Sequence, residues 1–517
     1  MRGVSEPARF RDLPAAHETL SPAELRFERA RRTLGLAAGP LAFALLLLFP
    51  VPAPSPAGAR LTAILAWVLV WWISEAVPIP VTSLLGPALA VVCGVGSAAE
   101  IFAPFGDPIV LFFLGSFVLA EAMAASGLDR RFAYAILRRP GVSATPTRLL
   151  VGFAAISAGL SAWLNNTATT AMLYPIGLSV LSALARAAGD VDPRRLRFGT
   201  ALMLILAYAS SIGGIATPVG TAPNLITLGQ LDALAGVRIP FFHWMLLAVP
   251  IALVMLAILL VWLRLALPPD VPGARGVRAE LLAQAARLPP LSRAERNVLA
   301  AFGATVAGWV LPGVLAVALG AESASVRALQ RVLPESVVAI LGAALLFVLP
   351  IDWRARRFTL AWSDAARIDW GTLLLFGGGL SLGGAMFRTG MAQALGDGLV
   401  AWTGGGSLVV LTFLFAWVAL ALTETTSNTA TATMIAPLAI AAAQSAGVSP
   451  IPPAVAVALA SSMAFMLPVS TPPNAIVYGS GAIPITAMLR HGTVLDLASA
   501  FVVPTGVLLG CRLLGLG

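Results

Sequence analysis

Long apolar stretches separated by short polar breaks are the feature that most limits what this chain can fold into. They recur from Leu36 to the C-terminus, and most approach the length of about 20 residues that a helix needs to cross a bilayer. Only 11% of the 517 residues are charged, whereas soluble domains carry about 25% charged residues. We therefore expect an all-α polytopic membrane protein.

Eleven of the stretches are predicted to be transmembrane helices. Two further runs, 147–182 and 406–443, are too long for one crossing, and polar residues interrupt each of them in the middle. We interpret these two runs as re-entrant hairpins that enter and leave the membrane on one side. The predicted spans are 35–51, 61–77, 82–96, 108–126, 198–230, 238–266, 299–320, 336–351, 369–392, 454–480 and 492–516.

The arginines gather in alternate loops, which predicts the orientation of the chain. Loops 129–148, 186–197 and 352–357 are rich in arginine, whereas 97–107 and 393–405 contain none. Cytoplasmic loops carry the excess of basic residues, so we expect a multi-pass protein of a bacterial plasma membrane with a cytoplasmic N-terminus and an outer C-terminus. This distribution explains the sequence pI of about 10.9 without nucleic-acid binding.

Three sequence blocks occur twice in the same order. Phe113-Leu-Gly recurs at Phe376, 263 residues later; Asn166-Thr-Ala-Thr recurs at 428, after 262; and Thr221-Ala-Pro-Asn recurs as Thr471-Pro-Pro-Asn, after 250. The first hairpin is expected to open inward and the second outward, so the repeats are inverted, as in alternating-access transporters. The predicted parts are a cytoplasmic tail (1–34), a first inverted repeat (35–267), a cytoplasmic linker (268–298) and a second inverted repeat (299–517).

We expect the ligand-binding residues at the points where polar residues, glycine or proline interrupt the apolar runs. Segments 161–169 and 423–431 each place three adjacent polar side chains in mid-hairpin, where burial without partners costs several kcal/mol per group. Segment 213–224 contains glycine and proline and segment 467–474 contains proline, and these residues unwind a span. Helix capping and simple proline kinks are the structural alternatives. Free carbonyls at such breaks suit Na+, and free amides at helix starts suit an anion.

Three acids lie within apolar runs, where an ionisable residue is a functional candidate. Glu75 and Glu121 are interpreted as structural, Glu75 with a paired partner and Glu121 near Arg130. Glu424 directly precedes the second polar triplet, and we expect it to tune cation affinity or to hold the hairpin.

From 61 onward the chain resembles the divalent anion/sodium symporter family, which includes di- and tricarboxylate and sulfate carriers. The resemblance rests on Trp72-x2-Glu-Ala-x-Pro-x-Pro80, on both hairpin motifs and on both Thr-Pro breaks. It implies a secondary transporter that moves two or more Na+ with a divalent anion, most simply a C4-dicarboxylate such as succinate. It also implies an elevator-type displacement and a homodimer with its static scaffold near 37–100 and 299–351.

The resemblance also assigns site residues. The expected cation ligands are Ser161, Asn165, Asn166 and the backbone at Ala216 for one sodium, and Thr423, Thr426, Asn428 and the backbone at Ser470 for the other. The expected substrate-binding residues are Asn165, Asn166, Thr167, Thr217, Ser427, Asn428, Thr429, Thr471 and Pro472.

One residue departs from the family pattern. The first triplet begins with Asn165 where the family usually has serine, and asparagine is longer and carries amide donors. A sodium-independent dicarboxylate exchanger, a carrier of citrate, sulfate or another oxyanion, and an efflux carrier for oxyanions or weak-acid drugs therefore stay open. An enzyme would need convergent His, Asp, Glu or Cys at membrane depth, and a channel would need a continuous polar path. We expect neither.

Overall fold

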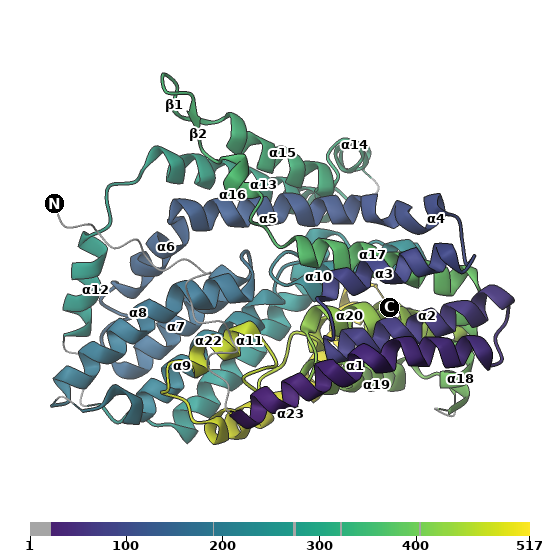
Figure 1. Cartoon of the computed structure of the whole chain (residues 1–517). Helices are drawn as coiled ribbons and strands as arrows, with labels where there is room; N and C mark the ends of the chain where they lie inside the picture. Colours follow the sequence, from purple (N-terminus) through teal and green to yellow (C-terminus); the bar gives the residue numbers. More distant parts are fainter. Residues whose placement is uncertain (1–21, 190, 272–275, 321–322, 403–404, 517) are drawn as a thin grey trace.

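The computed structural model describes residues 22–189, 191–271, 276–320, 323–402 and 405–516, and within them the fold is almost entirely helical (Figure 1). Most of the predicted N-terminal tail lies outside these residues. The one small sheet is an antiparallel pair, β1 (Pro350–Asp352) and β2 (Arg357–Phe358). It lies in the arginine-rich loop 352–357, which is long enough to turn back on itself.

The elements before residue 290 are these: α1 (Pro22–Leu48), α2 (Pro56–Ser74), α3 (Ile79–Val92), α4 (Ala98–Phe102), η3 (Ala103–Gly106), α5 (Pro108–Ser126), α6 (Leu128–Leu137), α7 (Pro146–Ser161), α8 (Asn166–Ala187), η4 (Pro193–Arg195), α9 (Arg197–Gly214), α10 (Ala222–Ala235), α11 (Phe241–Ala266) and α12 (Val277–Ala286).

The helices after residue 290 are these: α13 (Arg293–Leu319), α14 (Ala324–Val332), α15 (Glu335–Val348), α16 (Trp362–Ala365), α17 (Trp370–Arg388), α18 (Met391–Trp402), α19 (Leu408–Thr423), α20 (Asn428–Ser445), α21 (Ile451–Ala460), α22 (Pro472–Tyr478) and α23 (Ile485–Leu514).

Eight helical segments among the described residues are long and apolar enough to cross a membrane, and the bent pair α14–α15 makes a ninth if it counts as one span. The predicted spans 198–230 and 454–480 are not continuous helices. Each is broken, into α9 and α10 and into α21 and α22, at the glycines and prolines that the sequence places there. The predicted span 82–96 corresponds to α3, which has 14 residues. The prediction of eleven spans remains a prediction.

One helix from each break packs against helices of the other half of the chain. Helix α22 of the second half packs on α8 and α9 of the first, and α10 of the first half packs on α20 and α21 of the second. Figure 1 shows α9 beside α22, and α10 close to α20. The helix after each break thus packs on the second helix of the hairpin in the other half. Methionine, leucine, isoleucine and alanine fill α9 and α21 almost without exposed positions.

Side-chain contacts fix helix α12 and the last residues of the linker to the first half of the chain. Helix α12 packs on α6 and α8, where the Tyr134 hydroxyl donates a 2.5 Å hydrogen bond to Gln284 and Gln284 in turn donates to Ser179. Arg131 on α6 forms a bidentate pair with the buried Glu295 at the start of α13. The linker therefore ties the first hairpin to α6, and α6 to α13.

Candidate functional site

The first hairpin tip is closed by a hydrogen bond across the gap between its two helices. Helix α7 ends at Ser161 and α8 begins at Asn166, and the Ser161 hydroxyl donates to Asn166 Oδ1 over 2.7 Å. The side chain of Asn165 caps α8 by accepting a 2.7 Å hydrogen bond from the Ala168 amide. The capping alternative is thus correct for Asn165, but it does not account for the buried Asn166.

The second hairpin tip repeats this arrangement with different side chains. The Thr423 hydroxyl donates to Asn428 Oδ1 over 2.7 Å, and Ser427 Oγ caps α20 by accepting from the Ala430 amide. The Thr423 hydroxyl also lies 2.6 Å from the carbonyl oxygen of Ser461, in the second break. We call these two pairs, Ser161–Asn166 and Thr423–Asn428, the tip latches.

Each broken helix is bridged by an asparagine. The Asn224 amide donates to the carbonyls of Gly214 and Thr217 over 3.1 and 2.8 Å. Two hundred and fifty residues later, the Asn474 amide donates to the carbonyls of Ala464 and Leu467 over 3.1 and 3.0 Å. The unwound backbone is therefore fixed in the same form in both halves, which a simple proline kink does not require.

The first break packs directly on the first hairpin tip. The Thr217 hydroxyl donates to the Ala162 carbonyl. A Cβ at Gly220 would lie 2.5–2.9 Å from the carbonyl oxygens of Gly214, Ser161 and Ala162, so only glycine allows this approach. The predicted ligands Ser161, Asn166 and Ala216 thus lie within one small region.

The second break is held by an acid. Glu424 Oε1 accepts hydrogen bonds from the amides of Phe465 and Met466 over 2.7 and 3.2 Å, and Oε2 accepts from the Ser470 hydroxyl over 2.7 Å. Glu424 is only 4% exposed. The prediction that this acid holds its hairpin is confirmed, because it joins the tip to the unwound segment.

The predicted cation ligands and substrate residues differ in accessibility. Among the cation ligands, Ser161, Asn166, Thr423, Thr426 and Ser470 are buried. Most of the predicted substrate residues are exposed or partly exposed to solvent, whereas Asn166, Thr217 and Thr471 are buried. Asn165 and Pro472 are exposed, and the partly exposed residues are Thr167, Ser427, Asn428 and Thr429. Thr471 also caps α22 by accepting from the Asn474 amide.

Buried oxygen atoms without a partner gather around both breaks. Within the described part of the chain, Asn224 Oδ1 and Asn474 Oδ1 are buried and accept no hydrogen bond. The same holds for nearby hydroxyls, which are those of Ser157, Thr169, Ser211, Ser461 and Ser462. Amide, hydroxyl and carbonyl oxygens are hard ligands, so these residues fit a cation such as Na+.

Comparison with known proteins agrees with this geometry. The model of the sodium:sulfate symporter transmembrane region matches residues 31–514. The chain belongs to this symporter family. It is 36% identical over 475 residues to the sodium-dependent dicarboxylate transporter SdcS of Staphylococcus saprophyticus, covering 91% of this chain and 89% of that one. It is 34% identical over 479 residues to SdcS of Staphylococcus aureus strain USA300, covering 92% and 90%.

A solved structure supports the fold of this symporter family member. The YdaH transporter of Alcanivorax borkumensis superposes with a TM-score of 0.54 over 94% of this chain and 98% of that one, at 14% sequence identity. The family predicted from the tip and break motifs is therefore confirmed, as is the polytopic helical architecture.

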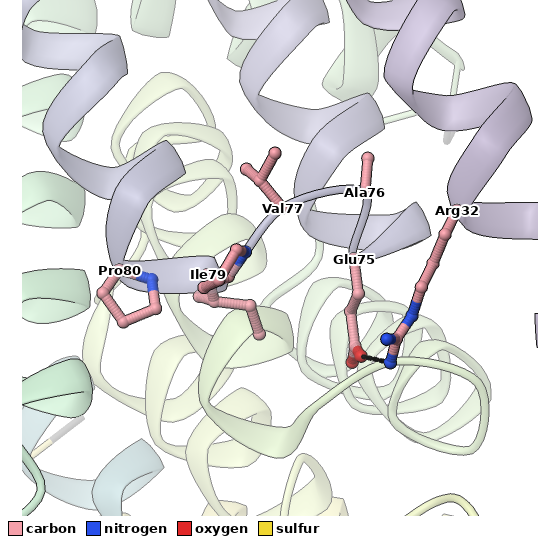
Figure 2. Close-up of a pocket in the computed structure, with 7 residues that line it drawn as sticks. Arg32, Glu75, Ala76, Val77, Ile79 and Pro80 are labelled. Atoms are coloured by element: carbon pink, nitrogen blue, oxygen red, sulfur yellow. Dashed lines mark ion pairs between the residues drawn. The ribbon is translucent and has the colours of Figure 1, made fainter. Parts of the chain in front are cut away.

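The family motif Trp72-x2-Glu-Ala-x-Pro-x-Pro80 spans the end of α2 and the start of α3, outside both hairpin tips. Figure 2 shows Glu75 and the residues after it lining a cavity of about 380 Å³ with Arg32. Glu75 lies 3.6 Å from the guanidinium groups of both Arg31 and Arg32, which confirms it as a paired acid. Arg31 also donates to the carbonyl of Thr425 over 3.2 Å, so α1 contacts the second tip.

Sequence reasoning left out two residues of the candidate site and one buried acid, and it misplaced one partner. Asn224 and Asn474 were visible as a repeated block, but their role as bridges needed the unwound backbone. Asp496 on α23 is an acid in an apolar run and could have been found by the rule that singled out Glu424. Glu121 was expected near Arg130, whereas the charges that act on it are those of Arg367 and Asp364.

Proposed function

We propose that this protein is a secondary active transporter that couples the movement of Na+ to that of a C4-dicarboxylate such as succinate. The observation that carries the proposal is the duplicated tip latch, which sets two matched oxygen-rich sites beside two helix starts. Relatives that span about nine tenths of the chain are named sodium-dependent dicarboxylate transporters, and that activity supports the same one here.

The two buried regions are proposed as two sodium sites. The first would use Ser161, Asn166 and the backbone at Ala216, with Asn165 at its edge. The second would use Thr423, Thr426, Asn428 and the backbone at Ser470. The orphaned oxygens of Asn224 and Asn474 support both sites, since a bound cation supplies the partner that each oxygen lacks.

The substrate would lie between the two tips. A dianion has a negative group at each end, and the starts of α8 and α20 each offer free amides and the positive end of a helix. The accessible side chains of Asn165, Thr167, Ser427, Asn428 and Thr429 surround those starts. Binding of Na+ beside each tip would fix the side chains that the substrate contacts, which makes the two ligands mutually dependent.

The remaining architecture is also proposed. The first hairpin would open inward and the second outward, with a cytoplasmic N-terminus and an outer C-terminus. Each tip, joined to its break by hydrogen bonds, would move as a body against a homodimeric scaffold that includes α2, α3, α13 and α15. Many apolar side chains on these helices face outward, Val92 and Val317 among them.

The test is uptake of radiolabelled succinate into proteoliposomes under an inward Na+ gradient or an equal K+ gradient. We expect uptake only with Na+, and expect Asn428→Ala and Thr429→Ala to abolish it without loss of folded protein. Ser182→Ala, a conservative change on α8 away from the tips, is the matched control. Uptake that ignores Na+ but needs internal succinate would identify an exchanger. Normal uptake by both tip variants would refute the site.

A further inference from the structure

The two hairpin tips each present one equivalent residue to the helices around them. Trp163 lies between α7 and α8, and Thr425, 262 residues later, lies between α19 and α20. Neither is an expected ligand of Na+ or of the substrate. Thr425 is exposed and Trp163 is partly exposed, so side chains from outside the hairpins can reach both positions.

An arginine on α1 reaches the second tip. The Arg31 guanidinium donates to the Thr425 carbonyl over 3.2 Å and to the Ile73 carbonyl of α2 over 3.5 Å. Thr425 follows the end of α19, where a helix has free carbonyls and the negative end of its dipole. Glu28 at 2.9 Å and Glu75 at 3.6 Å hold the same guanidinium from α1 and from the end of α2. Arg31 therefore joins the second tip to the packed pair of α1 and α2 (Figure 1).

Aromatic rings hold the equivalent residue of the first tip. Trp163 stacks on Phe241 with the ring centroids 6.1 Å apart, and it meets Phe302 of α13 nearly at right angles, at 5.8 Å. Both are favourable arrangements of two aromatic rings. Phe241 also stacks on Trp309 of α13 at 5.1 Å. The Trp309 indole donates to the Glu335 carbonyl over 3.0 Å, so the rings that contact Trp163 are fixed to α13 and to the start of α15.

Both contacts cross the same boundary. In the proposed architecture, α2, α13 and α15 belong to the scaffold, whereas each tip moves together with its break. A hydrogen bond is lost once its two atoms lie much more than 3.5 Å apart, so a small displacement of the second tip breaks the contact with Arg31. A contact that exists in only one arrangement of a protein stabilises that arrangement over the others.

We propose that Arg31 and Phe302 are positioning residues that fasten the two tips to the scaffold, Arg31 at Thr425 and Phe302 at Trp163. We call these two contacts the scaffold anchors. Resting on the proposed function, the anchors hold the present arrangement of the tips and open when the tips carry their ligands across the membrane. The second anchor depends on a charge-assisted hydrogen bond and the first on ring packing. Each can therefore be removed from the scaffold side without a change in the residues that would bind Na+ or the substrate.

The experiment measures distances between two spin labels by electron paramagnetic resonance, in the full chain in lipid nanodiscs, with K+ buffer and no substrate. The labels replace the exposed Val92 on α3 and Val409 on α19, which report the second hairpin against the scaffold. The two native cysteines, Cys93 and Cys511, are replaced by alanine.

Arg31→Met removes the second anchor and keeps the apolar stem of the side chain. Arg32→Met is the matched control, because Arg32 pairs with the same two acids, Glu28 at 3.0 Å and Glu75 at 3.6 Å (Figure 2). Among the described residues, Arg31 is the one of the two that bonds to the tip. We expect Arg31→Met to reduce at least twofold the fraction of molecules at the main wild-type distance, and Arg32→Met to leave that fraction unchanged. A wild-type distribution in Arg31→Met, or an equal change in Arg32→Met, would overturn the second anchor.

The first anchor is tested in the same way with labels at Val151 on α7 and Val317 on α13, both exposed. Phe302→Leu keeps an apolar side chain but loses the ring. Phe347→Leu is the control, since the Phe347 ring contacts Trp362 at 6.2 Å and not a tip. We expect the distances to change in Phe302→Leu alone, and wild-type distances in that variant would overturn the first anchor.

Succinate uptake by the wild type separates the anchors from the proposed function, because the distance measurement needs neither Na+ nor dicarboxylate. If the distances change in Arg31→Met and Phe302→Leu but the wild type takes up no succinate, the anchors stand and the proposed function is refuted. If uptake is coupled to Na+ and the distances stay as in the wild type, the proposed function stands and the anchors are overturned.

Discussion

The Thr423 hydroxyl is the atom through which the second tip latch is most sharply tested. It is fully buried and lies 2.7 Å from Asn428 Oδ1 and 2.6 Å from the Ser461 carbonyl. Thr423→Val keeps the shape of the side chain but removes the one hydroxyl hydrogen that these two acceptors share. A buried polar group that loses its partner costs about 1–3 kcal/mol. If that cost falls on Na+ binding, affinity drops by about 5- to 150-fold, at tenfold per 1.4 kcal/mol.

The assay is the Na+ concentration for half-maximal succinate uptake in proteoliposomes. Thr423→Ser is the matched control, because it keeps the hydroxyl and should stay close to the wild type. Ser161→Ala is the equivalent change at the first latch and should shift the Na+ dependence in the same direction. Wild-type Na+ dependence in Thr423→Val, with normal folding, would show that the latch does not position the second cation site.

Three further predictions rest on other parts of the molecule. Asn165→Ser should keep Na+-coupled uptake, measured in the same vesicles, because serine also caps a helix, and loss of coupling would show that the asparagine amide is needed. Burial raises the pKa of the Asp129 carboxyl from 3.8 to about 6. The fold is therefore favoured while this acid is protonated, below pH 3.8, and loses at most about 3 kcal/mol of stability as the pH rises through 6, at 1.36 kcal/mol per pH unit. Asp129→Asn should raise the thermal midpoint at pH 7 but not at pH 4. Arg131→Met should lower the thermal midpoint by several degrees, since it leaves the buried Glu295 without its cation, while Arg186→Met, whose ion pair is exposed, should change it little.

The sequence was sufficient for the parts of the fold that depend on local chemistry. The apolar runs predicted a helical membrane protein. Glycine and proline in 213–224 and proline in 467–474 predicted the two breaks. The hairpin tips were predicted from adjacent polar residues at 161–169 and 423–431. All of these depend on residues close together in the chain, where residue type alone determines what is possible.

What the sequence did not predict depends on contacts between distant residues. No local pattern says that Asn224 bridges the Gly214 and Thr217 carbonyls, because the bridge exists only once the backbone is unwound. The hydrogen bonds that Glu424 accepts from the Phe465 and Met466 amides, 41 and 42 positions away in the sequence, require the second break to pack on the second tip. The number of eleven spans stays a prediction, since half-helices inside the bundle look like whole ones in a hydropathy pattern.

The inverted repeat explains why the two halves share the same bridges but differ in charge. A symmetric ancestor would give two equal cation sites, and the tip latches and asparagine bridges still match at shifts of 262 and 250 residues. The charge differs beside the two tips, because Glu424 at the second tip stands in place of Ala162 at the first. A site with a net negative charge binds a cation more tightly than a neutral site of the same geometry. The second site should therefore fill first, and its occupancy should order the second tip before the substrate arrives.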